Sequence, residues 1–332
     1  MSATVSRSRR PRPGPRTGAS GAPAGRTGDR VLRTLCAAAG VLVVATLVYI
    51  GYQVASSASP AVSRLGLSFL TVGDWAPNFG RFGAANLVYG TVVTSLFGLL
   101  LAGPLGIAIA LFLSLIAPPR VRAVIGPLVE LLAAVPSIIF GFWGFLVLAP
   151  FIQKQEPSLH SALGFIPLFG PPQTTGLSLF TAGIVLTLMM LPIIASLCRD
   201  LFLTVPQELR DGAEALGATR WEVIRGIVLP STISGVSAAL VLGLGRALGE
   251  AIAVSLVIGD ADFAHVSLFD PGETLAAKIA IQFPAPVSNL HLAAMFYAGL
   301  VLLVIGLITS LSARAIAGRF DVQRGYARAV AA

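Results

Sequence analysis

An arginine and a glutamate interrupt one of the longest apolar stretches of the sequence. Arg246 lies near the middle of the segment from Thr232 to Gly259, where a charge within hydrocarbon costs at least about 2.5 to 3.5 kcal/mol. Glu250 follows four residues later, one helical turn or about 6 Å along the axis, so the two side chains are expected to pair on one face. Because intramembrane ionisable residues often line a pathway, we expect Arg246 to attract an anion in transit and Glu250 to orient Arg246 and offset its charge. A structural ion pair that only locks two helices together is the alternative.

Three glycines lie close to this pair in the sequence, and they bear on how the helix packs. They are expected to remove side chains around Arg246 so that another helix can approach closely. They do not form a dinucleotide-binding fingerprint, because no strand precedes them and the whole segment is apolar helix. The three are Gly243, Gly245 and Gly249.

A polar island between two apolar segments runs from Asp211 to Pro230. Residues 208–216 are good helix formers, and Gly217 is expected to end that helix in a left-handed turn. A second short helix is predicted over 218–228, with Trp221, Ile224 and Val228 on one face. Pro230 suits the first turn of the next span, where its missing N–H costs nothing. The simplest alternative is an ordinary amphipathic loop on the membrane surface.

The composition predicts an all-α integral membrane protein. Of the 332 residues, 55% are hydrophobic and 11% are charged, whereas soluble domains carry about 25% charged residues. Six apolar stretches approach the roughly 20 residues that cross a bilayer as a helix, which predicts one six-span domain over residues 31–315. The predicted spans are Val31–Ala55, Leu87–Ile116, Ile125–Phe151, Thr175–Cys198, Thr232–Gly259 and Leu290–Ala313.

The distribution of positive charge predicts the orientation, because cytoplasmic flanks collect Lys and Arg. Eighteen of the 23 Lys and Arg residues lie on one side of the predicted spans, and four lie on the other. This bias places both termini and the loop 199–230 in the cytoplasm and explains the net charge of +8 without nucleic-acid binding. Residues 1–30 are predicted to be a disordered basic tail, with a lipid contact as a secondary possibility, and residues 316–332 a second cytoplasmic tail.

Residues that could serve other chemistries lack the necessary partners. Neither Lys154 nor Lys278 follows a glycine-rich loop, so no phosphate-binding loop is predicted, and we expect no cofactor in this chain. The cysteines, Cys36 and Cys198, lie in opposite regions of the chain and near the predicted cytoplasmic ends of spans, where thiols stay reduced, so no disulfide, metal site or redox role is expected. The histidines and the acidic residues of the outer loops are predicted to be solvated. These are His160, His265, His291, Asp74, Asp260, Asp262, Asp270 and Glu273.

The sequence resembles the PstC-type permease subunits of bacterial phosphate-specific ABC importers over residues 69–319. The polar island matches the spacing of the importer coupling motif, with Asp211 where Glu is usual and Gly212 where Ala is usual. The other matching motifs are Ser68–Thr71, Phe82–Gly83, Tyr89–Ser95, Glu130–Ser137, Phe140–Gly144, Glu214–Trp221 and the run that ends in Arg246–Glu250. The resemblance implies the type I ABC importer permease fold with a cytoplasmic coupling-helix loop. It also implies that the ATPase is contacted through Asp211, Gly212, Ala213, Glu214, Gly217, Trp221, Ile227, Leu229 and Pro230.

The transported ion is less firmly specified than the fold. Ala251 stands where the phosphate family usually has Thr, and sulfate and molybdate permeases share a similar Arg-Ala-x-Gly-Glu run. Ala253–Val254 and Pro136–Gly141 favour phosphate over these oxyanions. An ATP-independent secondary transporter remains a further alternative, whereas an intramembrane enzyme would need a catalytic pair that the sequence lacks.

The resemblance also implies an assembly in the plasma membrane. The expected partners are a second, related permease chain, two ATP-binding subunits that hold ATP and Mg, an extracytoplasmic phosphate-binding protein, phosphate itself and membrane lipid. This chain is then a transporter subunit that works by alternating access, and ATP hydrolysis takes place in the partner subunits.

Overall fold

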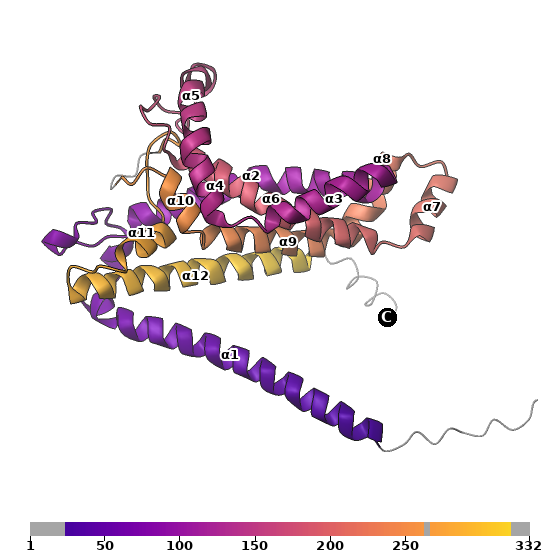
Figure 1. Cartoon of the computed structure of the whole chain (residues 1–332), viewed down its shortest axis with the longest axis horizontal. Helices are drawn as coiled ribbons and strands as arrows, with labels where there is room; N and C mark the ends of the chain where they lie inside the picture. Colours follow the sequence, from indigo (N-terminus) through magenta and orange to yellow (C-terminus); the bar gives the residue numbers. More distant parts are fainter. Residues whose placement is uncertain (1–23, 262–265, 320–332) are drawn as a thin grey trace, which may run out of the picture. The chain divides into compact units, whose positions relative to one another are not determined.

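The computed structural model describes residues 24–261 and 266–319, and the regular elements of these residues are all helical (Figure 1). Contacts divide the chain into two compact units, residues 1–52 and 53–332. The first contains the start of α1, an apolar helix whose described side chains are almost all exposed. The second contains the remaining elements. The helices are α1 Ala24–Leu65, α2 Ala85–Leu111, α3 Pro119–Ala133, α4 Ser137–Trp143, α5 Ala149–Leu163, α6 Leu179–Leu203, α7 Gln207–Ala215, α8 Arg220–Val223, α9 Leu229–Leu248, α10 Ile252–Val257, α11 Leu275–Gln282 and α12 Asn289–Arg319.

Six helical runs within the described residues are long and apolar enough to cross a membrane, which confirms the predicted number of spans. Three of the runs include a π-helical turn, over residues 112–116, 144–148 and 224–228. Such a turn keeps the backbone hydrogen-bonded while shifting the side-chain register. The six runs are Gly28–Leu70, Ala85–Ile116, Ser137–Leu163, Leu179–Leu203, Arg220–Leu248 and Asn289–Ser312.

Three predicted spans have the wrong limits: the first was expected to end at Ala55, but its helical run continues to Leu70. The third was expected over 125–151, but the chain leaves the helical conformation between Ala133 and Ser137, and the spanning run begins only at Ser137. Pro136 explains the break, because a proline disfavours helical geometry in the residue before it. The fifth was expected over 232–259, yet it begins at Arg220 and ends at Leu248. At the N-terminus, α1 begins at Ala24, inside the stretch predicted as a tail, whereas residues 1–23 lie outside the described part.

The core of the second unit forms around α6, which packs against α2, α9 and α3. Met190, Ile194, Cys198 and Phe202 of α6 are almost completely buried. Because lipid tails are as apolar as these side chains, their burial stabilises the bundle mainly through van der Waals packing. An ion pair of 2.8 Å between Arg199 and the α3 residue Glu130 adds a polar link at one end of α6.

A second apolar cluster joins the turn after α1 to α2, α11 and α12. Phe69 stacks on Tyr297 with ring centroids 4.2 Å apart. Beside them, His291 is 2% exposed and its Nε2 lies 2.9 Å from the Gln282 side-chain oxygen, which also accepts a bond from the Trp75 indole. The prediction that His291 is solvated is therefore wrong, because Gln282, nine residues earlier, is a partner for its buried ring.

Of the other two histidines predicted to be solvated, only His160 lies in the described part of the chain. His160 is half-buried, and its Nδ1 lies 2.8 Å from the carbonyl oxygen of Phe169. It therefore holds the loop after α5 rather than standing free in solvent. His265 lies outside the described residues, as does Asp262.

The loop before α11 buries charge that was predicted to be solvated. Glu273 and Lys278 are 5% and 6% exposed and contact each other directly, and the Lys278 ammonium lies 3.8 Å from Asp260. Asp270 is also buried, and its carboxylate accepts a 2.7 Å bond from the Gln173 amide. The prediction is wrong for Asp270 and Glu273 because each has a polar partner that the fold brings to it.

The substitution Gly90→Ala tests the packing of α2 on this loop. A Cβ at Gly90 would lie 1.9 Å from the backbone oxygen of Glu273, and a backbone atom cannot move aside as a flexible side chain can. We expect the free energy of unfolding to fall by about 2 kcal/mol or more, measured by thermal unfolding of the purified protein. Gly306→Ala in α12 is the control, because an added Cβ there meets no described atom within 4 Å. Equal stability of the two variants would contradict the packing.

Glu273 predicts a pH dependence of stability. Burial, together with a hydrogen bond to Asp260, raises the pKa of Glu273 from 4.5 to about 8, although Lys278 opposes the shift. The folded protein therefore holds this proton more tightly than the unfolded chain. The resulting stabilisation is full below pH 4.5 and is lost as the pH rises through about 8. In thermal unfolding from pH 5 to 9, Glu273→Gln is expected to flatten this decline, and an unchanged slope would contradict the assignment.

Candidate functional site

Arg246 and Glu250 lie on either side of the end of α9. The helix ends at Leu248, and the chain leaves the helical conformation over residues 249–251 before α10 begins. The predicted pairing occurs: the Arg246 Nη2 lies 3.8 Å from the Glu250 Oε2. The predicted continuous helix is wrong, because Gly249 adopts a non-helical conformation and closes α9, so that Arg246 lies near the end of the spanning run and not near its middle.

Glu250 has two partners, which explains how a carboxylate 7% exposed is held. Its Oε1 accepts a 3.2 Å bond from the backbone N–H of Ala253, in the first turn of α10. The first N–H groups of any helix lack partners within that helix. Glu250 therefore satisfies a backbone donor with one oxygen and faces Arg246 with the other, while the Arg246 side chain is 49% exposed.

The three glycines differ in what they contact. A Cβ at Gly243 would lie 3.1 Å from the Ile194 side chain, so this glycine permits close packing of α9 on α6. A Cβ at Gly245 would meet no described atom within 4 Å, and one at Gly249 would be 3.7 Å from the Gly245 oxygen. The predicted close helix approach is therefore seen at Gly243 but not at the other two within the described chain.

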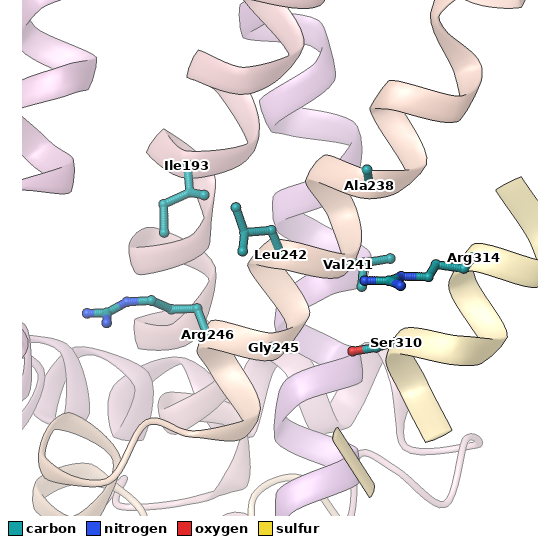
Figure 2. A pocket seen from close by; sticks show the side chains of 8 residues that line it. All are labelled: Ile193, Ala238, Val241, Leu242, Gly245, Arg246, Ser310 and Arg314. Carbon is teal, nitrogen blue, oxygen red and sulfur yellow. The ribbon is translucent and has the colours of Figure 1, made fainter. Parts of the chain in front are cut away.

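A groove of about 630 Å³ opens along α9, between α6 and α12 (Figure 2). Its walls are mainly apolar, with two guanidinium groups that come from different helices: Arg246 of α9 and Arg314 of α12. Arg314 is one of the 18 positive residues that the sequence places on the cytoplasmic side, and nothing in its local sequence indicates a groove. The lining residues are Ile193, Ala238, Val241, Leu242, Gly245, Arg246, Ser310 and Arg314.

The coupling loop, residues 199–230, forms two short helices joined by a turn. All nine residues of α7 are exposed or half-buried. Gly217 has a φ of +90°, as predicted, and its N–H donates to the Glu214 oxygen at 2.9 Å. Thr219 then caps α8: its hydroxyl accepts from the Glu222 N–H, while the Glu222 carboxylate accepts from the Thr219 N–H at 2.7 Å.

The second half of the loop departs from the predicted pattern. Pro230 is the second residue of α9 and lies in its first turn, as predicted, although the helical run is continuous from Arg220 to Leu248 through the π-helical turn 224–228. Ile224 and Val228 are buried, but Trp221, in the short helix before that turn, is 62% exposed. The predicted shared face of these three residues is therefore wrong.

Apart from Pro230, which is half-buried, the predicted coupling residues divide into an inner and an outer set. Ala213, Ile227 and Leu229 pack against the main apolar core. The outer set of exposed residues consists of Asp211, Gly212, Glu214, Gly217 and Trp221. The inner set anchors the loop, and the outer set leaves a surface open to a partner. In Figure 1, α7 and α8 lie at one end of the second unit, α10 and α11 lie at the other, and α9 connects them.

This chain is similar in sequence to known transport permeases. Residues 102–322 match the family described as binding-protein-dependent transport system inner membrane component. A phosphate transport system permease protein PstC from Mesorhizobium japonicum is 41% identical over 303 residues, covering 90% of this chain and 92% of the relative. PstC 2 of Mycobacterium tuberculosis is 40% identical over 300 residues, covering 88% and 93%. The chain belongs to the PstC-type permeases. The resemblance predicted from the motifs is confirmed.

The solved structures support the fold of this permease. A bacterial alginate ABC transporter, in complex with an alginate pentasaccharide-bound periplasmic protein, matches with a TM-score of 0.57. The match covers 89% of this chain and 97% of that one at 16% identity. A similarity at this low identity is evidence for the fold alone, and it confirms the predicted ABC importer permease fold. The six apolar helical runs and the family match show that the permease is a multi-pass membrane protein.

The substitution Gly217→Val tests the turn between α7 and α8. A branched residue at φ +90° costs of order 1 to 3 kcal/mol, so we expect the turn to rearrange and the surface of α7 to be misplaced. In a pull-down of the ATP-binding subunits by the purified permease, binding is expected to fall at least about tenfold. Gly226→Val is the control, because its φ is not positive and its Cβ meets no described atom within 4 Å. Wild-type binding by both variants would reject the role of the turn.

Proposed function

We propose that this chain is a transmembrane permease subunit of an ATP-driven inorganic phosphate importer and forms half of the translocation pathway. The observation that carries the proposal is the Arg246–Glu250 pair beside a groove in the spanning region. Relatives of about 40% identity over most of their length are named phosphate transport permeases, which supports phosphate as the ion.

The chemistry of the groove suits an oxyanion that must bind and then leave. A guanidinium presents a planar fork of donors that matches the oxygens of phosphate. Glu250 offsets part of the Arg246 charge and is itself buried, so a dianion near Arg246 meets both attraction and repulsion. Binding of this kind is strong enough for entry and weak enough for release.

The coupling loop supplies the contact with the ATP-binding subunits in this proposal. Its outer surface carries three large exposed apolar side chains: Leu209, Leu216 and Trp221. Closure of two ATP-binding subunits is proposed to move this surface and tilt the run that ends at Leu248, so that the Arg246 region opens alternately to each side. ATP and Mg belong to those subunits, and this chain holds no cofactor.

The rest of the assembly follows from the family and the charge distribution. A second, related permease chain completes the pathway opposite α9, as a heterodimer, and an extracytoplasmic phosphate-binding protein delivers the ion. The excess of arginine at both ends of the chain and in the coupling loop favours cytoplasmic termini in the plasma membrane.

Competing oxyanions are the main alternative. Uptake of labelled phosphate by the complete complex in proteoliposomes, with unlabelled sulfate and molybdate as competitors, decides between them. Phosphate uptake that neither competitor reduces supports the proposal, whereas transport of sulfate or molybdate without phosphate would reject the substrate. Dependence on ATP rather than on an ion gradient separates an importer from a secondary transporter.

The substitution Arg246→Gln tests the pathway directly. We expect phosphate uptake to be abolished while the complex still assembles, because the half-exposed side chain makes little contribution to packing. Uptake in proteoliposomes gives the transport result, and size-exclusion chromatography gives the assembly result. Arg225→Gln, an exposed change of the same type, is expected to transport normally. Normal uptake by the Arg246→Gln complex would overturn the pathway.

A further inference from the structure

A second cavity lies at the base of the coupling loop and is lined by a set of residues distinct from those of the groove. Its volume is about 380 Å³, and it is bounded by the end of the second span, α3, α7 and α8. The polar groups that line it are unusually concentrated for a chain with 11% charged residues. They include Ser114, Arg122, Arg210, Asp211, Glu214 and Arg220.

The cavity has more donors than acceptors. Three guanidinium groups face two carboxylates, and within the described residues none of the three arginines forms an ion pair with Asp211 or Glu214. The Nε of Arg210 is buried and has no hydrogen-bond partner among the described residues. A buried donor is costly to leave without an acceptor, so an acceptor group bound in this cavity would lower that cost.

The arginines come from three separate elements. Arg122 belongs to α3, and its Nη2 is already fixed by a 2.9 Å bond to the Ser114 oxygen. Arg210 belongs to α7 and Arg220 begins α8. A group with several acceptor oxygens would bind all three at once, which a single carboxylate does less well.

We propose that this cavity binds a phosphate group through Arg122, Arg210 and Arg220. The group comes either from a free inorganic oxyanion or from the headgroup of an anionic lipid, because both present the same tetrahedral oxygens. Since the ligand bridges α3 to α7 and α8, occupancy restrains the coupling loop against the rest of the permease. The site is independent of the ion that the groove carries.

Hydrogen exchange of the coupling loop in the complete complex tests the site. The complex is placed in phosphatidylcholine nanodiscs, and inorganic phosphate is compared with chloride at equal ionic strength. Phosphate is expected to slow exchange over residues 207–223. Arg210→Gln and Arg122→Gln, on separate elements, should each raise the phosphate concentration needed by about tenfold or more. Arg225→Gln, which removes the same charge nearby but does not line the cavity, should leave it unchanged.

The outcomes distinguish inorganic phosphate from a lipid headgroup, and this cavity from the groove beside Arg246. Slowed exchange without added phosphate in nanodiscs that contain phosphatidylglycerol, lost in Arg210→Gln, identifies a lipid headgroup. The Arg246→Gln complex should respond as the wild type does, so the test stands even if the proposed transport route fails. Loss of the response in Arg246→Gln, an equal loss in Arg225→Gln, or no response to either phosphate or anionic lipid would overturn the proposal.

Discussion

The cost of leaving a backbone donor or a charge unpaired in hydrocarbon is the constraint on which the centre of this permease depends. The chain leaves α9 at Gly249, which exposes the first N–H groups of α10. Glu250 bonds one of them and faces Arg246 with its other oxygen. The break in the span and the intramembrane charge pair are therefore one arrangement, since each supplies the partner that the other requires.

Much of the architecture follows from local sequence. Hydropathy predicts six spans because each needs about 20 apolar residues, and Gly217 predicts its turn because the left-handed conformation favours glycine. Hydropathy cannot show where a span is interrupted, so the breaks at Pro136 and Gly249 were missed. Window averages remain high on both sides of each break.

The site was predicted less completely than the fold. Arg246 and Glu250 are four residues apart, and their pairing is visible in the sequence. Arg314 lines the same groove from α12, and Lys278 lies 3.8 Å from Asp260 across a loop. Each of these residues is far in sequence from its neighbour in space, so no short motif predicts either contact. Three-to-four-residue spacing groups Trp221 with Ile224 and Val228, yet Trp221 is exposed, because spacing alone cannot show where the protein core ends and the surface begins.

The uninterrupted run from Arg220 to Leu248 makes the permease a lever with unequal arms. At 1.5 Å per residue, Arg246 lies about 39 Å from the end that begins beside the coupling loop. A pivot near the π-helical turn would leave a short arm at the loop and a long arm at the charge pair. With such a pivot, a displacement at the loop would be larger at Arg246, near the far end of the run.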